Sequence, residues 1–369
     1  MDAQKARRVR GETLRLCHSG LDSNRLGLQA ERLLSTVVPF DRSCWHNIDP
    51  ASSMLTSVIG EAAPTDPLLP VLEYGTADVN HYADLARARV PVSALRMATR
   101  GRPAVSRRYR EVLQPMQIED ELTASFVIGG TFWGSARLYR SGRWPPFDAV
   151  EVAFVAGLAP ILAEGFRSAL LARSALVGGV TEGPGVVILN EDSNLVESIT
   201  PAATRWLQEV IDVVPQPGEL LPHPLYAIAG RIRAIANGVD TAQIARCRVP
   251  MRSGGWLVLH GMRLVIACRE CISIIVEPAL ATELAPLVVS AYGLTKREQE
   301  VARHALQGWS TKRIAEALGL SPYTVSDHLR QVFEKVGVHT RTEFASRIFF
   351  DYYWPRLAEA DRPTPRSSA

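Results

Sequence analysis

The stretch LTKREQEVARHALQGWSTKRIAEALGLSPYTVSDHLRQVFEKVGV, residues 294–338, decides the fold of the C-terminal part of this chain. Thr295 and Glu298 stand three residues apart, directly before an apolar-periodic run, which is the capping-box pattern that begins a helix. Ser310 is expected to cap a second helix. Gly319-Leu320 then supplies a tight turn.

A third helix follows this turn at once. Ser321-Pro322 combines an N-cap with a proline at the first helical position, and Gly337 is expected to end the helix after about Val336. A fourth helix is predicted to begin near Thr340. Helices joined by a short turn that contains glycine are typical of the helix-turn-helix.

The third helix divides its residues between two faces. At 100° per residue, one stripe should pack inward; it consists of Val325, Leu329, Val332 and Val336. The opposite face can present side chains to base edges, and the helix N-terminus can approach phosphate. Arg330 can grip guanine or phosphate with two hydrogen bonds, and Asp327 can accept one from cytosine. The predicted DNA-contacting residues are Lys312, Arg313, Ser321, Tyr323, Thr324, Ser326, Asp327 and Arg330.

Residues 295–349 closely resemble the DNA-binding domain of LuxR-type transcriptional regulators. The resemblance rests on residues 294–301, 308–315, 320–329 and 335–338 as they stand above, and it is nearly continuous. It implies that double-stranded DNA is a partner. The family often has Lys directly after the Thr-Val pair, where this chain has Ser326 followed by Asp327, so the resemblance does not define a target sequence.

The net charge of the 369-residue chain is located in the same region. The whole chain carries a formal charge of +3, and residues 294–350 hold nine Lys and Arg against six Asp and Glu. The entire surplus therefore lies in this segment, which fits a polyanionic partner. Five cysteines do not make a disulfide scaffold in so long a chain. The chain lacks a secretory signal pattern and an uninterrupted apolar run of membrane-spanning length, so we expect a cytoplasmic protein without a membrane partner.

Residues 1–177 read as a first α+β unit. Helical periodicity runs over residues 7–37 with a break at residues 20–23, after which Asn24 is a candidate cap. Strands are predicted at residues 43–48, 54–59, 123–128 and 131–139, and a long amphipathic helix at residues 147–176. This unit loosely resembles a GAF domain.

Residues 178–278 read as a second α+β unit. A strand–turn–strand pattern at residues 186–199 leads into a helix at residues 201–211. A helix near residues 226–236 and strands at residues 245–251, 255–267 and 271–276 complete the unit. It resembles a PAS domain. Both resemblances imply a small-molecule pocket without naming a ligand. A linker helix over residues 279–293 and a tail over residues 355–369 are also predicted.

Several side chains allow more than one interpretation. Trp45, Tyr82, Phe126 and Trp133 are candidates for lining a ligand pocket, with aromatic core packing as the alternative. His18, His46 and His81 are each a conceivable haem ligand, but an ordinary polar or core histidine is favoured. Cys268 and Cys271 form a lone Cys-x-x-Cys, which favours structural cysteines over a metal site or a redox pair.

The sequence contains no Gly-rich phosphate loop and no catalytic elbow or zinc-protease motif. We therefore expect no enzyme, no cofactor, no metal and no catalytic residues. The predicted fold is multidomain, with two α+β sensor modules, GAF-like and PAS-like, followed by an all-α four-helix helix-turn-helix domain at residues 294–354.

The predicted function is ligand- or partner-controlled transcription regulation. RNA polymerase is a possible further partner. A homodimer is expected because recognition of two half-sites needs two DNA-binding domains. Phe344, Ile348 and Tyr352 are the candidate dimer contacts. The alternative is a redox- or ligand-sensing signalling enzyme or scaffold in which the helix-turn-helix binds protein.

Overall fold

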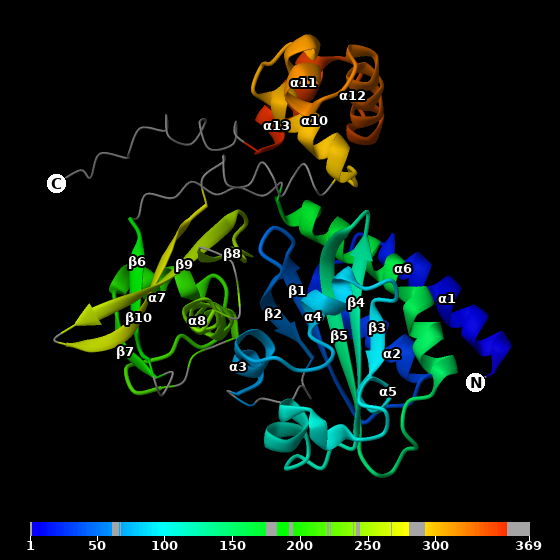
Figure 1. Ribbon diagram of the computed structural model, residues 1–369, viewed down its shortest axis with the longest axis vertical. Coiled ribbons are helices and arrows are strands. Elements are labelled where there is room, and N and C mark those ends of the chain that lie inside the picture. Colours follow the sequence, from blue (N-terminus) through cyan, green and yellow to red (C-terminus); the bar gives the residue numbers. More distant parts are fainter. Residues whose placement is uncertain are drawn as a thin grey trace, which may run out of the picture.

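The structure is a computed structural model that describes residues 2–60, 66, 68–174, 183–191, 195–219, 221, 223–238, 240, 244–266, 268–279 and 292–352. For residues 171–174, 223 and 347–352 it describes the backbone alone. Figure 1 shows three units that follow one another along the chain. The predicted linker helix lies outside the described residues except at 279, 292 and 293, and the predicted tail lies wholly outside them.

The first unit is built on a five-stranded antiparallel sheet, sheet A, with strand order β2-β1-β5-β4-β3. Its strands are β1 (Arg42–Asp49), β2 (Met54–Ile59), β3 (Val92–Ala94), β4 (Asp120–Ile128) and β5 (Thr131–Arg140). Its helices are α1 (Ala3–Cys17), α2 (Ser23–Ser35), α3 (Leu68–Gly75), α4 (Tyr82–Arg87), α5 (Leu95–Ala98), η1 (Pro103–Val105), the π-helical turn η2 (Tyr109–Leu113) and α6 (Ala149–Ser174).

Sheet A is covered on both faces, so its central strands are buried almost throughout. Leu122, Ala124 and Phe126 of β4 lie in the hydrophobic core that α2 and α6 share with the sheet. Because side chains alternate along a strand, Glu121 and Thr123 point to the opposite face, where α3, α4 and the segment around η2 lie. This second, polar layer was not predicted.

The expected strands and the long helix of this unit are present, with one correction at α2. That helix begins at Ser23, and its N-cap is Asp22 rather than Asn24. The Asp22 side chain accepts a hydrogen bond from the Arg25 amide at 2.9 Å. Both residue types favour the cap, so the sequence alone did not fix the position.

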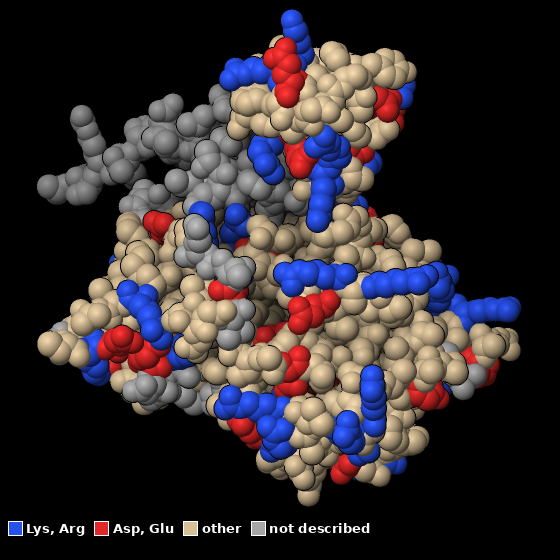
Figure 2. All heavy atoms as spheres, in the orientation of Figure 1, with Lys and Arg blue, Asp and Glu red and all other residues tan. Residues whose placement is uncertain are grey.

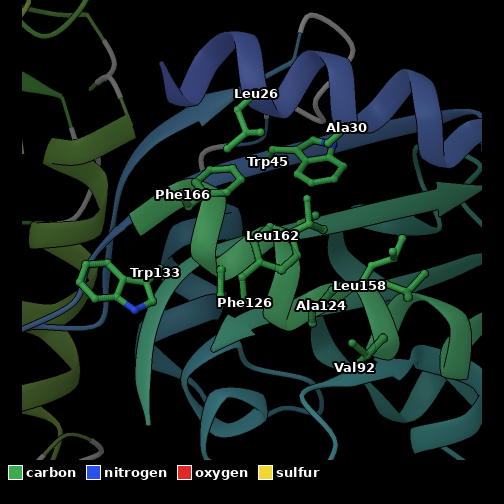
Figure 3. Close-up of a cluster of buried hydrophobic side chains, with 14 of the residues drawn as sticks. Leu26, Ala30, Trp45, Val92, Ala124, Phe126, Trp133, Leu158, Leu162 and Phe166 are labelled. Atoms are coloured by element: carbon green, nitrogen blue, oxygen red, sulfur yellow. The ribbon is translucent and has the colours of Figure 1, made fainter. Parts of the chain in front are cut away.

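Helix α6 has the length and apolar composition of a membrane span over Ala149–Leu170. In this structure it lies on sheet A, where Val155, Leu158 and Leu162 are buried in the first core. Figure 3 shows Leu158, Leu162 and Phe166 directed toward Trp45, Phe126 and Ala124. Its apolar character is thus used for packing inside the first unit.

The second unit repeats the strand order of the first. Its antiparallel sheet B runs β7-β6-β10-β9-β8, which is the same sequence of first, second, third, fourth and fifth strand. The elements are β6 (Gly185–Asn190), β7 (Val196–Ile199), α7 (Pro201–Gln208), α8 (His223–Ala236), β8 (Ala245–Pro250), β9 (Trp256–Ile266) and β10 (Arg269–Pro278). These bounds agree with the predicted order of elements.

The first two units share an apolar interface. Met54 of β2 is fully buried in the core of the second unit, and Trp256 of β9 is buried in the core of the first. Helices α3 and α8 pack so closely that a Cβ on Gly230 would meet the Pro70 carbonyl oxygen at 3.0 Å. Arg248 reaches Asp49 across the boundary, with Nη1 3.1 Å from Oδ1. The first two units, which were predicted separately from the sequence, are therefore packed against each other.

The C-terminal unit contains four helices: α10 (Lys296–Leu306), α11 (Thr311–Leu318), α12 (Pro322–Val336) and α13 (Arg341–Tyr352). Its core includes Val301, Ile314, Val325, Val332 and Phe344. The number and order of these helices are as predicted, and each predicted start lies within two residues of the observed one.

Candidate functional site

The caps of the C-terminal unit have the predicted geometry. Thr295 accepts from the Glu298 amide at 3.3 Å, and Glu298 accepts from the Thr295 amide at 2.6 Å, which completes the capping box. Ser321 caps α12 by accepting from the Thr324 amide at 3.0 Å. Gly319 adopts φ +63°, a left-handed conformation in which a Cβ is disfavoured. The turn between α11 and α12 is therefore specified by Gly319 and Ser321 together.

Helix α12 separates an inner stripe from an outer face, as predicted. Val325, Leu329, Val332 and Val336 are its buried residues. On the other side, Tyr323 is 84% exposed, and the side chains of Arg330 and Asp327 are 70% and 41% exposed. Such a face is available to base edges if the helix enters a major groove.

An ion pair on this outer face was not foreseen from the sequence. Arg330 Nη2 donates to Asp327 Oδ1 at 2.5 Å, and Gln331 Nε2 donates to the other carboxylate oxygen at 3.3 Å. Their i, i+3 and i, i+4 spacings could have suggested the contacts. The pair presents a hydrogen-bond donor and an acceptor side by side, so Arg330 does not act as an isolated cation.

The other predicted DNA-contacting residues lie in the first turn of α11 and in the first turns of α12. Lys312 and Arg313 are exposed on α11, and the Arg313 guanidinium lies 4.1 Å from the centre of the Trp309 ring. Thr324 Oγ1 is 2.8 Å from Ser321 Oγ. Ser326 is exposed, and its hydroxyl donates to the Pro322 carbonyl at 3.0 Å.

Three basic residues of the same segment have structural partners. Lys335 Nζ lies 2.6 Å from Glu298 Oε2. Arg297 donates to the Leu318 carbonyl at 2.6 Å, and Arg341 donates to the Ala305 carbonyl at 2.9 Å. Counting charges along the sequence did not distinguish these residues from those that face solvent. On the face of this unit that Figure 2 shows, Lys and Arg lie beside Asp and Glu.

The three predicted dimer contacts have different environments. Phe344 is 1% exposed and packs in the domain core, with its ring centre 5.8 Å from that of Phe333. It is therefore unavailable as a surface contact in this structure. The side chains of Ile348 and Tyr352 lie outside the described residues.

The four aromatic residues predicted to line a pocket do not share one environment. Trp45 and Phe126 pack under α6, with ring centres 5.6 Å apart, and Phe126 is 5.5 Å from Phe166. Trp133 belongs to the same core but lies toward its edge (Figure 3). Tyr82 lies on the other face of sheet A, where Arg137 stacks on its ring. This placement agrees with core packing for Trp45 and Phe126.

The remaining candidate residues are also separated. His18 is exposed at the end of α1, whereas His46 and His81 are buried on the polar side of sheet A. Cys268 is exposed in a turn with φ +63°, and Cys271 is buried on β10. Within the described parts of the chain, no three His, Cys, Asp or Glu residues gather as metal ligands.

Comparison with known proteins identifies one part of the chain. Residues 293–348 match the family "Bacterial regulatory proteins, luxR family". The chain is 50% identical over 56 residues to the transcriptional regulatory protein UhpA of Escherichia coli K12, a match covering 15% of this chain and 29% of UhpA. It is 44% identical over 56 residues to the monoamine regulon transcriptional regulator of Klebsiella aerogenes, covering 15% and 25%. The match thus spans less than a third of each relative's length.

A solved structure of the phage VqmA–DPO complex is similar at 16% identity and a TM-score of 0.27, covering 50% of this chain and 88% of that one. The resemblance of the C-terminal unit to the LuxR type is confirmed by the family match. That match covers residues 293–348 and does not extend to the units that resemble GAF and PAS domains.

Proposed function

We propose that this chain is a sequence-specific, DNA-binding transcriptional regulator. The observation that carries the proposal is helix α12: its N-terminus is capped by Ser321, its apolar stripe is buried, and Tyr323, Ser326, Asp327 and Arg330 line its outer face. The luxR family match over residues 293–348 supports this use of the helix. In this reading α12 enters the major groove, and Lys312, Arg313 and Thr324 contact the phosphate backbone.

The first two units are proposed to control this DNA-binding unit. The GAF-like and PAS-like resemblances and the shared strand order of sheets A and B favour sensory units that respond to a small molecule or a partner. A signal that binds one domain arrangement better than another shifts the population toward it. We place the protein in the cytoplasm and assign it no enzymatic activity.

A homodimer is part of the proposal because one head reads only a half-site. Ile348 and Tyr352 on α13 remain the suggested contacts, whereas Phe344 is committed to the core of its own unit. Contact with RNA polymerase would follow if the protein activates transcription. Sedimentation with and without operator DNA tests the dimer, which fails if only monomer is found in both states.

The cysteines give little support to the alternative of a redox-sensing protein. Burial raises the pKa of the Cys44 thiol to about 11, although the Tyr139 hydroxyl opposes that shift. A high pKa keeps a thiol protonated and poorly nucleophilic. Cys268 is exposed while Cys271 is buried, so the two thiols do not present one accessible site.

Genomic footprinting followed by binding measurements tests the DNA-binding proposal. On a footprinted site, Arg330→Ala should weaken binding by roughly 1–3 kcal/mol, about 5- to 150-fold. Arg303→Ala is the matched control, because Arg303 is an exposed arginine on α10 outside the proposed contact set. Equal affinity of the parent chain and Arg330→Ala at matched salt would show that α12 is not the reading helix.

A further inference from the structure

The polar face of sheet A contains a group of ionisable side chains that the proposed DNA contacts do not use. We call it the buried charged cluster: Glu73 from α3, His81 before α4, Arg108 before η2, Glu121 from β4 and Arg137 from β5. The side chains of Arg108 and Glu121 are 0% exposed. Burying a charge is strongly unfavourable unless partners compensate it. The cluster is therefore an expensive feature of the first unit.

Two arginines and two glutamates alternate within the cluster. Arg108 Nη2 donates to Glu121 Oε1 at 2.8 Å, and Arg137 Nη2 donates to Glu73 Oε2 at 2.5 Å. Arg137 Nε lies 3.6 Å from Glu121 Oε2 and links the two pairs. The formal charges of these four side chains cancel. Their attraction explains why they are tolerated inside the unit.

The cluster has more unpaired hydrogen-bond donors than unpaired acceptors. Arg108 Nε, Arg108 Nη1 and Asn80 Nδ2 are buried donors without a hydrogen-bond partner in this structure. His81 Nε2 accepts from the Asp78 amide at 3.0 Å. A ring proton is consequently on Nδ1, which has no hydrogen bond but lies 3.7 Å from Glu73 Oε2, within ion-pair distance.

Acceptors are scarce in the same place. Glu121 Oε2 is the unpaired acceptor of the cluster, and Arg137 Nε lies within ion-pair distance of it. Arg108 Nη2 already donates to the carbonyl of Val79 at 3.2 Å, and Asn80 is the residue that follows Val79. The unpaired donors of the cluster therefore lack acceptor oxygens. Each buried donor that stays unsatisfied destabilises the fold.

We infer that the buried charged cluster is a binding site for a small oxyanion, held by Arg108 with help from Asn80 and His81. Hydrogen bonds from arginine to an anionic oxygen are about twice as strong as neutral ones. The ligand must be small, because the side chains of Arg108 and Glu121 are fully buried. This inference rests on the proposed function, since it assigns a ligand class to a sensory unit.

The chemistry is shared by carboxylates and by inorganic phosphate, so the test uses both. The full chain is titrated with sodium acetate and with sodium phosphate, against sodium chloride at matched ionic strength, and its thermal unfolding is followed. A ligand that binds only the folded state raises the unfolding temperature in a saturable way. We expect saturation with acetate or with phosphate, and no comparable saturation with chloride.

Three variants identify the site. Arg108→Lys keeps the charge opposite Glu121 but removes the Nε and Nη1 donors, and should weaken anion binding at least tenfold. Arg107→Lys is the matched control, because Arg107 is 48% exposed and pairs with Glu111 on the surface. Glu121→Gln removes a negative charge beside the site, so anion binding should become several-fold tighter even if the variant unfolds at a lower temperature.

Two results would overturn the inference: no saturable shift with either anion in the parent chain, or equal shifts for Arg108→Lys and Arg107→Lys. The first result would assign the orphaned donors to trapped water alone. Operator binding by the parent chain is measured in parallel. If the parent chain binds operator DNA but shows no anion response, this inference fails while the proposed function stands. If the parent chain does not bind DNA, the proposed function itself fails.

Discussion

Two arginine–carboxylate pairs in this molecule have the same chemistry and opposite surroundings. Arg108–Glu121 joins N and O atoms 2.8 Å apart with both side chains 0% exposed, and Arg330–Asp327 joins them 2.5 Å apart with side chains 70% and 41% exposed. In the interior, desolvation makes each charge depend on its partner. At the surface, water replaces the partner at little cost, so the pair remains available to an incoming molecule.

The largest expected effect is a loss of stability that tests the difference between the buried pair and the exposed pair. Glu121→Ala should destabilise the chain by about 3–5 kcal/mol, because Arg108 loses its carboxylate and stays buried. Asp327→Ala, the surface counterpart, should change stability by less than about 1 kcal/mol. Urea unfolding of both variants measures the contrast. Equal losses would mean that burial does not distinguish the two pairs.

Acid should lower the stability of the fold by protonating Glu73 of the buried charged cluster. Burial, the largest single influence, would raise the pKa of Glu73, but Arg137, His81 and Arg108 together outweigh it and lower that pKa from 4.5 to about 2. Ionised Glu73 therefore stabilises the fold above pH 4.5, and its contribution, on the order of 3 kcal/mol, is lost as pH falls toward 2. Urea unfolding at pH 7, 5, 4 and 3 checks this.

The control for this pH dependence is Glu73→Gln, which cannot ionise at that position. Its stability should fall less between pH 5 and pH 3 than that of the parent chain. Identical pH dependence of the two proteins would show that Glu73 is not held ionised by Arg137 and His81.

An intermediate effect is expected at Lys335, which links α12 to a buried carboxylate. Glu298 is 2% exposed and Lys335 is 37% exposed. Lys335→Ala should cost about 1–2 kcal/mol, because the carboxylate keeps its capping role but loses its cation. DNA affinity per folded molecule should not change. A drop in affinity without a drop in stability would assign Lys335 to the DNA contact instead.

The smallest effect should come from Asp327→Asn. Removing the carboxylate frees Arg330 and takes a negative charge away from the phosphates, so non-specific DNA binding should tighten by a few-fold at low salt. The preference for the base pair facing Asp327 should relax. Selection of binding sites from a random pool, compared for parent and variant, measures this. An unchanged affinity and preference would remove Asp327 from the interface.

The local pattern of the sequence predicted elements better than it predicted environments. The caps and the turn glycine of the C-terminal unit depend on residues within four positions of one another, so Thr295, Ser321 and Gly319 could be interpreted directly. The second layer on sheet A could not be foreseen, because Glu73, Arg108 and Arg137 come from elements up to 64 residues apart. Alternation along β4 does not say what will cover each face.

In the candidate site, too, local features were predictable and contacts between distant residues were not. The outer face of α12 was predictable from helical periodicity, whereas the binding partners of Arg297, Lys335 and Arg341 were not. Trp45 and Phe126 are aromatic residues on neighbouring parts of one sheet, and either a cavity or a packed core fits that pattern. Only the position of α6 above them shows that Phe126 packs against both Trp45 and Phe166.

By itself, the sequence determined the helix-turn-helix of the C-terminal unit and the order of the helices and strands outside the segment between β2 and β4, because capping and periodicity are local properties. It also located the whole +3 surplus in that segment. The tertiary structure decided which of those charges face solvent, which residues of the first two units pack together, and where five ionisable groups become buried. Burial and pairing depend on contacts between distant segments, and these exist only once the chain has folded.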